Sequence, residues 1–271
     1  TEDVLDRRAT IQRESFYFSN ADRRDTLLVD INIWTEDVAL GDLDGDGDLD
    51  IVCGIRAENR LVWFENVSAS TLEFKEHRIE IDGGSTGGFN MAYADLNSDG
   101  RLDIVVPVGS ALGQGIAWIE QPESPAASWR FHTIGTMMPD LLVGFTIADI
   151  NQDGHPDIMG GSYSRGARDE DGDIGVDGAL GRIAWYENPG KPDTGWTRHD
   201  VSRRKRGMFD KFIARDMDGD GDIDFVSTRG NSDPYDGVFW LEQVRTDKPV
   251  VSFERAREND SEEVAIPKNR R

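Results

Sequence analysis

An aspartate-rich segment of nine residues recurs four times in the chain and constrains the fold more than any other feature. The copies read DLDGDGDLD from Asp42, DLNSDGRLD from Asp95, DINQDGHPD from Asp149 and DMDGDGDID from Asp216. A short apolar run precedes each copy and another follows it. Such runs are typical of strands, so each segment is expected to be a loop that joins two strands.

Two further patterns complete the repeat. A third strand is marked by Trp, an apolar residue, Glu and an amide, starting at Trp63, Trp118, Trp185 and Trp240. A fourth strand opens with an aromatic residue, at Phe74, Trp129, Trp196 and Phe253. His follows three positions later in the first three repeats, and Ala256 takes that place in the last. The periodic Trp and His residues are expected to serve packing, with the Trp side chains between blades.

Four short strands per repeat describe one blade of a β-propeller. We therefore predict an all-β fold, a single propeller domain over residues 1–271, with complete blades at about 37–82, 90–135, 144–202 and 211–258. Runs within 11–34 and 263–267 are expected to form a fifth blade from both termini, because closure leaves no exposed sheet edge. The alternative is that the chain is part of a seven-bladed ring.

The loops have the composition of calcium sites. Calcium takes six to eight oxygen ligands, which acidic or amide side chains at loop positions 1, 3, 5 and 9 and a backbone carbonyl at position 7 can supply. Glycine at position 6 permits the sharp turn. We expect about four Ca²⁺ ions, one per loop. The predicted side-chain ligands are Asp42, Asp44, Asp46, Asp50, Asp95, Asn97, Asp99, Asp103, Asp149, Asn151, Asp153, Asp157, Asp216, Asp218, Asp220 and Asp224. The predicted backbone ligands are Asp48, Arg101, His155 and Asp222, and the His155 imidazole is expected to face solvent.

The loops and their flanking strands resemble FG-GAP or VCBS repeats, as found in integrin α-subunit propellers and many secreted bacterial proteins. The resemblance covers about four fifths of the chain and implies a calcium-binding propeller. Family members usually close with seven blades. They act as adhesion modules, lectins, or parts of carbohydrate-active proteins, so the resemblance specifies the fold and the metal more sharply than the function.

Composition excludes some classes of function. A net charge of −22 argues against binding nucleic acid through its phosphates. No apolar run approaches the roughly 20 residues of a membrane helix, so membrane insertion is not expected. Cys53, the single cysteine, lies in an apolar run and is expected to be a buried packing residue.

We predict a calcium-stabilised binding module, extracellular, cell-surface or periplasmic, that recognises a glycan or a protein. The alternatives are a carbohydrate-active enzyme of lyase or dehydratase type and a structural spacer; no catalytic residue is assigned, because no nucleophile or catalytic metal motif is present. Binding is expected on the face opposite the metal loops, where segments differ most between repeats. The candidate ligand-binding residues are Trp34, Arg203, Arg204, Arg206, Arg215, Arg229 and Tyr235. The basic run at 203–206 could equally be a solvated surface or pair with the acidic residues at 169–173 of an insertion in the third repeat.

Overall fold

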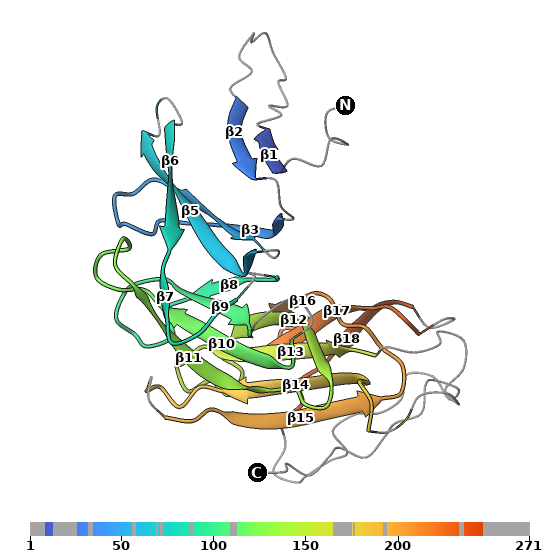
Figure 1. The fold of residues 1–271 in the computed structure, drawn as a ribbon. Coiled ribbons are helices and arrows are strands. Elements are labelled where there is room, and N and C mark those ends of the chain that lie inside the picture. The colour runs from blue at the N-terminus through green and yellow to red at the C-terminus, as the bar shows by residue number, and fades with distance from the viewer. Residues whose placement is uncertain are drawn as a thin grey trace, which may run out of the picture.

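The computed structural model describes residues 9–12, 26–31, 35–55, 58–68, 70, 73–86, 89–108, 113–164, 175, 177–191, 194–232 and 236–245. These residues form 18 strands in five sheets and contain no α-helix (Figure 1). Four of the sheets are the blades of a propeller. The predicted all-β propeller is therefore confirmed.

Each blade is an antiparallel sheet in which successive strands are neighbours. Blade 1 contains β3 (Thr35–Gly41), β4 (Asp50–Ile55), β5 (Arg60–Ser68) and β6 (Glu73–Ile79). Blade 2 contains β8 (Ala92–Ala94), β9 (Asp103–Pro107), β10 (Gly115–Glu120) and β11 (Trp129–Thr136). Blade 3 contains β12 (Leu141–Ala148), β13 (Asp157–Tyr163), β14 (Gly181–Glu187) and β15 (Thr197–Arg204). Blade 4 contains β16 (Phe212–Arg215), β17 (Asp224–Arg229) and β18 (Gly237–Leu241).

The middle strands of a blade are apolar on both faces because each face packs on a neighbouring blade. All five residues of β9 are buried, and so are the four central residues of β10. One hydrophobic cluster joins blades 1 and 2, a second joins blades 2 and 3, and a third joins blades 3 and 4. The core is thus divided among the interfaces between blades.

Apolar residues are exposed on the outer face of blade 4, as Val38 and Leu40 are on β3 of blade 1. Ile213, Val238 and Trp240 are 59%, 74% and 47% exposed. The sequence predicts Trp240 in the same interblade position as Trp63 and Trp118, which are 3% and 1% exposed. The difference arises because the face that carries Trp240 is the one that a following blade covers in the earlier repeats.

A short additional strand fastens blade 1 to blade 2. After β6, strand β7 (Ile81–Asp82) pairs in parallel with the beginning of β11, with Ile81 opposite Trp129. The sheet of blade 2 therefore has five strands, and the chain that leaves blade 1 forms its outer edge.

The fifth sheet consists of β1 (Ala9–Gln12) and β2 (Thr26–Ile31), which pair with each other and lie apart from the four blades in Figure 1. Residues 15–18 and 263–267, which the predicted closing blade requires, lie outside the described residues. The closing blade and the blade spans given above therefore stay predictions.

Candidate metal loops

Each aspartate-rich loop joins the first and second strands of its blade. The strand ladder pairs the residue before the loop with the ninth loop residue, as in Gly41↔Asp50 and Ala94↔Asp103. The sixth residue has a positive φ in every loop, at Gly47 (94°), Gly100 (86°), Gly154 (89°) and Gly221 (96°). Only glycine adopts this conformation without steric cost, which explains why glycine occupies position 6 in all four loops.

The first aspartate of each loop holds the turn together. In loop 1, Asp42 Oδ1 accepts a hydrogen bond from the Gly45 amide (2.8 Å) and Oδ2 accepts one from the Gly47 amide (3.1 Å). Asp216 accepts the same pair of bonds, whereas Asp95 and Asp149 accept from the amides of the fifth and sixth loop residues. These backbone hydrogen bonds therefore fix the carboxylate at the inside of the turn.

The third and fifth residues are oriented in the same way. Asp44 Oδ1 accepts from the Asp46 amide (3.2 Å), and Asp46 Oδ1 accepts from the Asp48 amide (2.8 Å). The pattern repeats in the other three loops. Each of these side chains keeps its second oxygen or amide group for another partner.

The ninth aspartate is a buried link between the loop and the third strand. Asp103 is 0% exposed; its Oδ2 accepts from the Leu96 amide (2.9 Å) and its Oδ1 from the Gln121 amide (3.0 Å). The bonds recur at Asp50, Asp157 and Asp224. Burial raises the pKa of Asp103 to about 7 and that of Asp157 to about 6, against the lowering effect of these backbone hydrogen bonds.

Three carboxylates converge in loops 1 and 4. Oxygens of Asp42, Asp44 and Asp50 lie within 4.8 Å of one another, as do oxygens of Asp216, Asp218 and Asp224. Desolvation raises the pKa of Asp44, and the negative charges of Asp46, Glu65 and Asp42 add to the effect. These clusters could hold a metal ion, because carboxylate oxygens at this separation can bind one cation and cancel their own repulsion.

Loops 2 and 3 carry asparagine at the third position. Asn97 Nδ2 donates to Asp99 (3.0 Å) and to Glu120 (3.2 Å). Asn151 makes the same two bonds, to Asp153 (3.0 Å) and to Glu187 (3.4 Å). The amide thus supplies hydrogen-bond donors at the place where loops 1 and 4 accumulate negative charge.

Loop 2 also contains a positive charge. The Arg101 guanidinium forms an ion pair with Asp99 and donates from Nε to the Gln121 carbonyl (2.9 Å). The corresponding residue of loop 3, His155, is half-buried, and its ring lies so close to Gly190 that a Cβ there would be 2.4 Å from Nε2. The expectation that this imidazole faces solvent is therefore wrong, because Gly190 leaves room for it to pack.

A Trp, His and Glu cluster connects the third and fourth strands in blades 1 to 3. Trp118 stacks on His132 with ring centroids 4.3 Å apart, and His132 Nε2 is hydrogen bonded to Glu120 Oε2 (2.7 Å). Blades 1 and 3 repeat this arrangement with Trp63, His77 and Glu65 and with Trp185, His199 and Glu187. The periodic histidines lie in separate blades and serve packing, as predicted.

The amide residue that ends the third strand links one blade to the preceding one. Gln121 Nε2 donates to the Leu43 carbonyl in loop 1, and Asn188 Nδ2 donates to the Leu96 carbonyl in loop 2 (3.1 Å). Gln243 Nε2 donates to the Ile150 carbonyl in loop 3 (3.1 Å). In blades 2 to 4 the amide of the sequence pattern is therefore an interblade hydrogen-bond donor, whereas Asn66 of blade 1 donates to Leu49 of its own loop.

A buried ionic cluster lies at the other end of blade 3. Arg182 and Arg203 are opposite each other in the β14–β15 ladder, at the end far from the metal loop. Asp140, which is 0% exposed, accepts two hydrogen bonds from Arg203 (both 2.9 Å) and lies 2.8 Å from Arg182 Nε. Burial lowers the pKa of Arg182, while Asp140 and Asp200 oppose this shift.

The predicted ligand-binding residues occupy different environments. Arg203 and Arg204 are each 1% exposed and Arg206 is 7% exposed. Arg229 is half-buried and donates to Ser232 Oγ (3.0 Å), whereas Arg215 is exposed at the end of β16, beside loop 4. Trp34, Tyr235 and residues 169–173 lie outside the described residues. Their role in ligand binding stays a prediction.

Comparison with protein families identifies an FG-GAP-like repeat at residues 42–106. The match begins at the first aspartate of loop 1 and ends within β9, after loop 2. The chain is therefore a β-propeller that contains an FG-GAP-like repeat. Comparison of this propeller with curated proteins gave no match.

Two other features of the propeller concern membrane-spanning helices and the single cysteine. In the described part of the chain, no helix is long and apolar enough to span a membrane. Cys53 is 2% exposed, and burial raises the pKa of its thiol to about 12, which confirms a packing role.

The buried Asp140 was not predicted from the sequence. It belongs to none of the repeated patterns, and a single aspartate outside them gives no indication that it is buried.

Proposed function

We propose that this FG-GAP propeller is a calcium-stabilised binding module. The observation that carries the proposal is the convergence of three carboxylates within 4.8 Å in loops 1 and 4, on side chains already oriented by backbone hydrogen bonds. Calcium suits these loops because it accepts six to eight oxygens in a flexible geometry, whereas Mg²⁺ requires a near-ideal octahedron and keeps several waters.

The four loops are expected to differ in affinity. The number of charged ligands sets the affinity of a calcium loop. Loops 1 and 4 offer aspartate at positions 1, 3, 5 and 9, whereas loops 2 and 3 offer three aspartates and one asparagine. In loop 2, Arg101 already pairs with Asp99. We therefore propose that loops 1 and 4 fill first and that loop 2 binds most weakly.

The proposed cellular location follows from the calcium affinity expected of these loops. Loops of the weak class, with dissociation constants of roughly 10⁻⁴ to 10⁻³ M, fill only where calcium is near millimolar. This favours an extracellular, cell-surface or periplasmic protein, in keeping with where FG-GAP repeats typically occur.

The proposed ligand is a glycan or a protein bound at the end of the propeller opposite the metal loops. Two features support this end. It carries the long β13–β14 connection, and loops of unequal length on a rigid scaffold are the usual place for binding residues. The buried pairs of Asp140 with Arg182 and Arg203 would hold that end of blade 3 rigid.

Thermal unfolding tests the calcium part of the proposal. The purified chain would be unfolded with excess chelator, with calcium near 1 mM and with magnesium at the same concentration. We expect calcium, and not magnesium, to raise the unfolding temperature. An unchanged temperature on adding calcium would overturn the proposal.

A glycan array, run in calcium and in chelator, tests the binding part. Calcium-dependent capture of one glycan class supports a lectin role, and Arg229→Ala serves as the first variant at the opposite end. Absence of binding in both conditions rejects the glycan ligand and leaves a protein ligand to be tested by affinity capture with calcium and with chelator.

A further inference from the structure

The seventh residue of loop 4, Asp222, carries a buried carboxylate with an unsatisfied oxygen. Its side chain is 7% exposed, and its Oδ1 has no hydrogen-bond partner among the described residues. Desolvation raises the pKa of Asp222, and the carboxyl of Asp220, which lies within hydrogen-bonding distance, raises it further. Two carboxyl groups in contact repel each other when both are ionised, so they require a cation or a shared proton between them.

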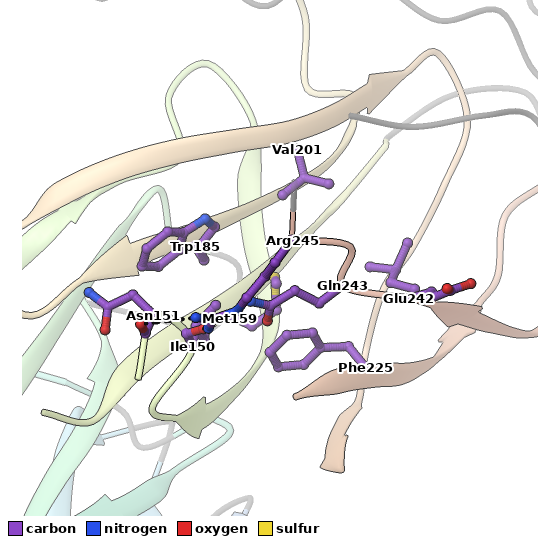
Figure 2. A pocket seen from close by; sticks show the side chains of 10 residues that line it. Ile150, Asn151, Met159, Trp185, Val201, Phe225, Glu242, Gln243 and Arg245 are labelled. Carbon is purple, nitrogen blue, oxygen red and sulfur yellow. Dashed lines mark hydrogen bonds between the residues drawn. The ribbon is translucent and has the colours of Figure 1, made fainter. Parts of the chain in front are cut away.

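Arg245 supplies only part of the positive charge that this pair requires. Its Nη2 donates to the Ile150 carbonyl (2.7 Å) and its Nη1 to the Asn151 carbonyl (3.5 Å), both in loop 3 (Figure 2). Its Nε is 3.9 Å from Asp222 Oδ2, which is too far for a hydrogen bond. The guanidinium is therefore held mainly by the backbone of loop 3, and it leaves Asp222 Oδ1 for another cation.

Loop 2 shows which kind of group fits beside the fifth loop residue. There the seventh residue is Arg101, whose guanidinium forms an ion pair with Asp99 and donates from Nε to the Gln121 carbonyl (2.9 Å). In loop 4 the corresponding groups are the Asp220 carboxylate and the Gln243 carbonyl, since the Gln243 amide donates to the ninth aspartate as the Gln121 amide does. The seventh residue of loop 4 adds a second carboxylate instead of a positive charge, so the same place requires a cation from solution.

The converging oxygens of loop 4 do not include those of the fifth aspartate. They belong to Asp216, Asp218 and Asp224. Asp220 Oδ1 instead accepts from the Asp222 amide (3.1 Å), and its carboxyl group contacts that of Asp222. Loop 4 contains five aspartates, so one divalent ion together with Arg245 would leave two negative charges. A second divalent ion would cancel them.

We propose that loop 4 binds a second divalent cation, separate from the proposed loop ion, through the side chains of Asp220 and Asp222 and the backbone carbonyl of Gln243. Calcium suits this set because all of its ligands are oxygen atoms, and water completes the coordination. Asp220 contacts both ions, whereas Asp222 contributes its carboxylate to the second. Loop 1 also has aspartate at the seventh position, but Asp48 is only half-buried, so the site is assigned to loop 4 alone.

Anomalous scattering from crystals grown with calcium locates the ions directly. The wild type is expected to show two peaks in loop 4, about 3.5–4 Å apart, as for paired metal ions in other proteins. Asp222→Asn retains the backbone carbonyl and should lose only the second peak. A single wild-type peak, at the converging oxygens of Asp216, Asp218 and Asp224, would overturn the inference and leave the proposed function intact. A peak beside Asp222 alone would support the inference and count against the proposed function. No peak in loop 4 would overturn the inference, and no peak in any loop would overturn both.

The number of ions bound in solution provides a second test. Equilibrium dialysis against saturating radioactive calcium is expected to show one ion fewer per chain in Asp222→Asn than in the wild type. Asp48→Asn is the matched control, because it removes the same charge from the same position of loop 1, and it should retain the wild-type number. Asp222→Arg, which gives loop 4 the residue type of loop 2, should also lose one ion. Equal numbers in the wild type and Asp222→Asn, or equal losses in the two asparagine variants, would contradict the proposal.

Discussion

Substituting Asp44 by asparagine should stabilise the chain in the absence of calcium and reduce the further stabilisation that calcium provides. The change converts the third position of loop 1 into that of loops 2 and 3. There the asparagine amide donates to the fifth loop residue and to the Glu of the third strand, as in Asn97 with Asp99 and Glu120. In loop 1 the corresponding acids, Asp46 and Glu65, instead repel Asp44.

The magnitude follows from these contacts. In chelator, Asp44→Asn gains hydrogen bonds and loses repulsion, so we expect the variant to be more stable by about 0.5–1.5 kcal/mol, the net value of one hydrogen bond. With calcium near 1 mM, a site with a dissociation constant of ~10⁻⁴ M stabilises the protein by about 1.4 kcal/mol, and one that is tenfold weaker by about 0.4 kcal/mol. The variant should therefore lose about 1 kcal/mol of the calcium effect.

Denaturant unfolding of both proteins, in chelator and in calcium, measures these differences directly. Asn151→Asp in loop 3 is the reverse control: it removes two hydrogen bonds and adds a carboxylate, so it should be less stable in chelator and respond more strongly to calcium. If Asp44→Asn is less stable than the wild type in chelator, or responds to calcium equally, the reasoning is refuted.

Three further outcomes are expected. Asp140→Ala leaves Arg182 and Arg203 buried without their shared partner and should cost about 3–5 kcal/mol in denaturant unfolding; a loss below about 1 kcal/mol would show that the cluster contributes little. Gln121→Ala removes the bond to the Leu43 carbonyl and should cost about 1–3 kcal/mol, more than the exposed-surface control Glu123→Ala. The pKa values of Asp103 (about 7) and Asp157 (about 6) in the folded protein lie above the value of 3.8 expected in the unfolded chain. The folded state therefore binds these protons more tightly than the unfolded state does. In chelator, the unfolding temperature should consequently fall as the pH rises from about 4 to 7. Calcium should weaken or reverse this dependence because it requires the ionised carboxylates, and a rise over the same range in chelator would contradict the assignment.

Much of the scaffold was accessible from the sequence because the repeat encodes it locally. The spacing within each loop predicts the turn, the glycine at position 6 and the inward carboxylates, all of which involve residues fewer than ten positions apart. The Trp and Glu of the third strand and the His of the fourth are likewise predictable as one packing unit, since the strand register fixes which of them meet.

Contacts between distant parts of the chain could not be predicted. The basic run at 203–206 suggests an exposed patch, yet Arg203 is buried because its partner, Asp140, is brought to it from 63 residues away. The bond from Gln121 to the Leu43 carbonyl spans 78 residues, and an amide at the end of a strand gives no indication of it. Such pairs depend on how one blade sits against the next, which no local pattern specifies.

Side-chain hydrogen bonds from the amide residues of blades 2, 3 and 4 to the loop of the preceding blade connect the four candidate metal loops in series. The backbone of Gln121 holds Asp103 of loop 2, and its side chain holds loop 1; Asn188 and Gln243 extend the same linkage to loops 3 and 4. Ordering one loop therefore restricts its neighbours, so that part of the conformational entropy cost of filling the next loop has already been met. Ions would then enter this propeller as a coupled series, and emptying loop 2, the proposed weakest site, would loosen loops 1 and 3 on either side of it.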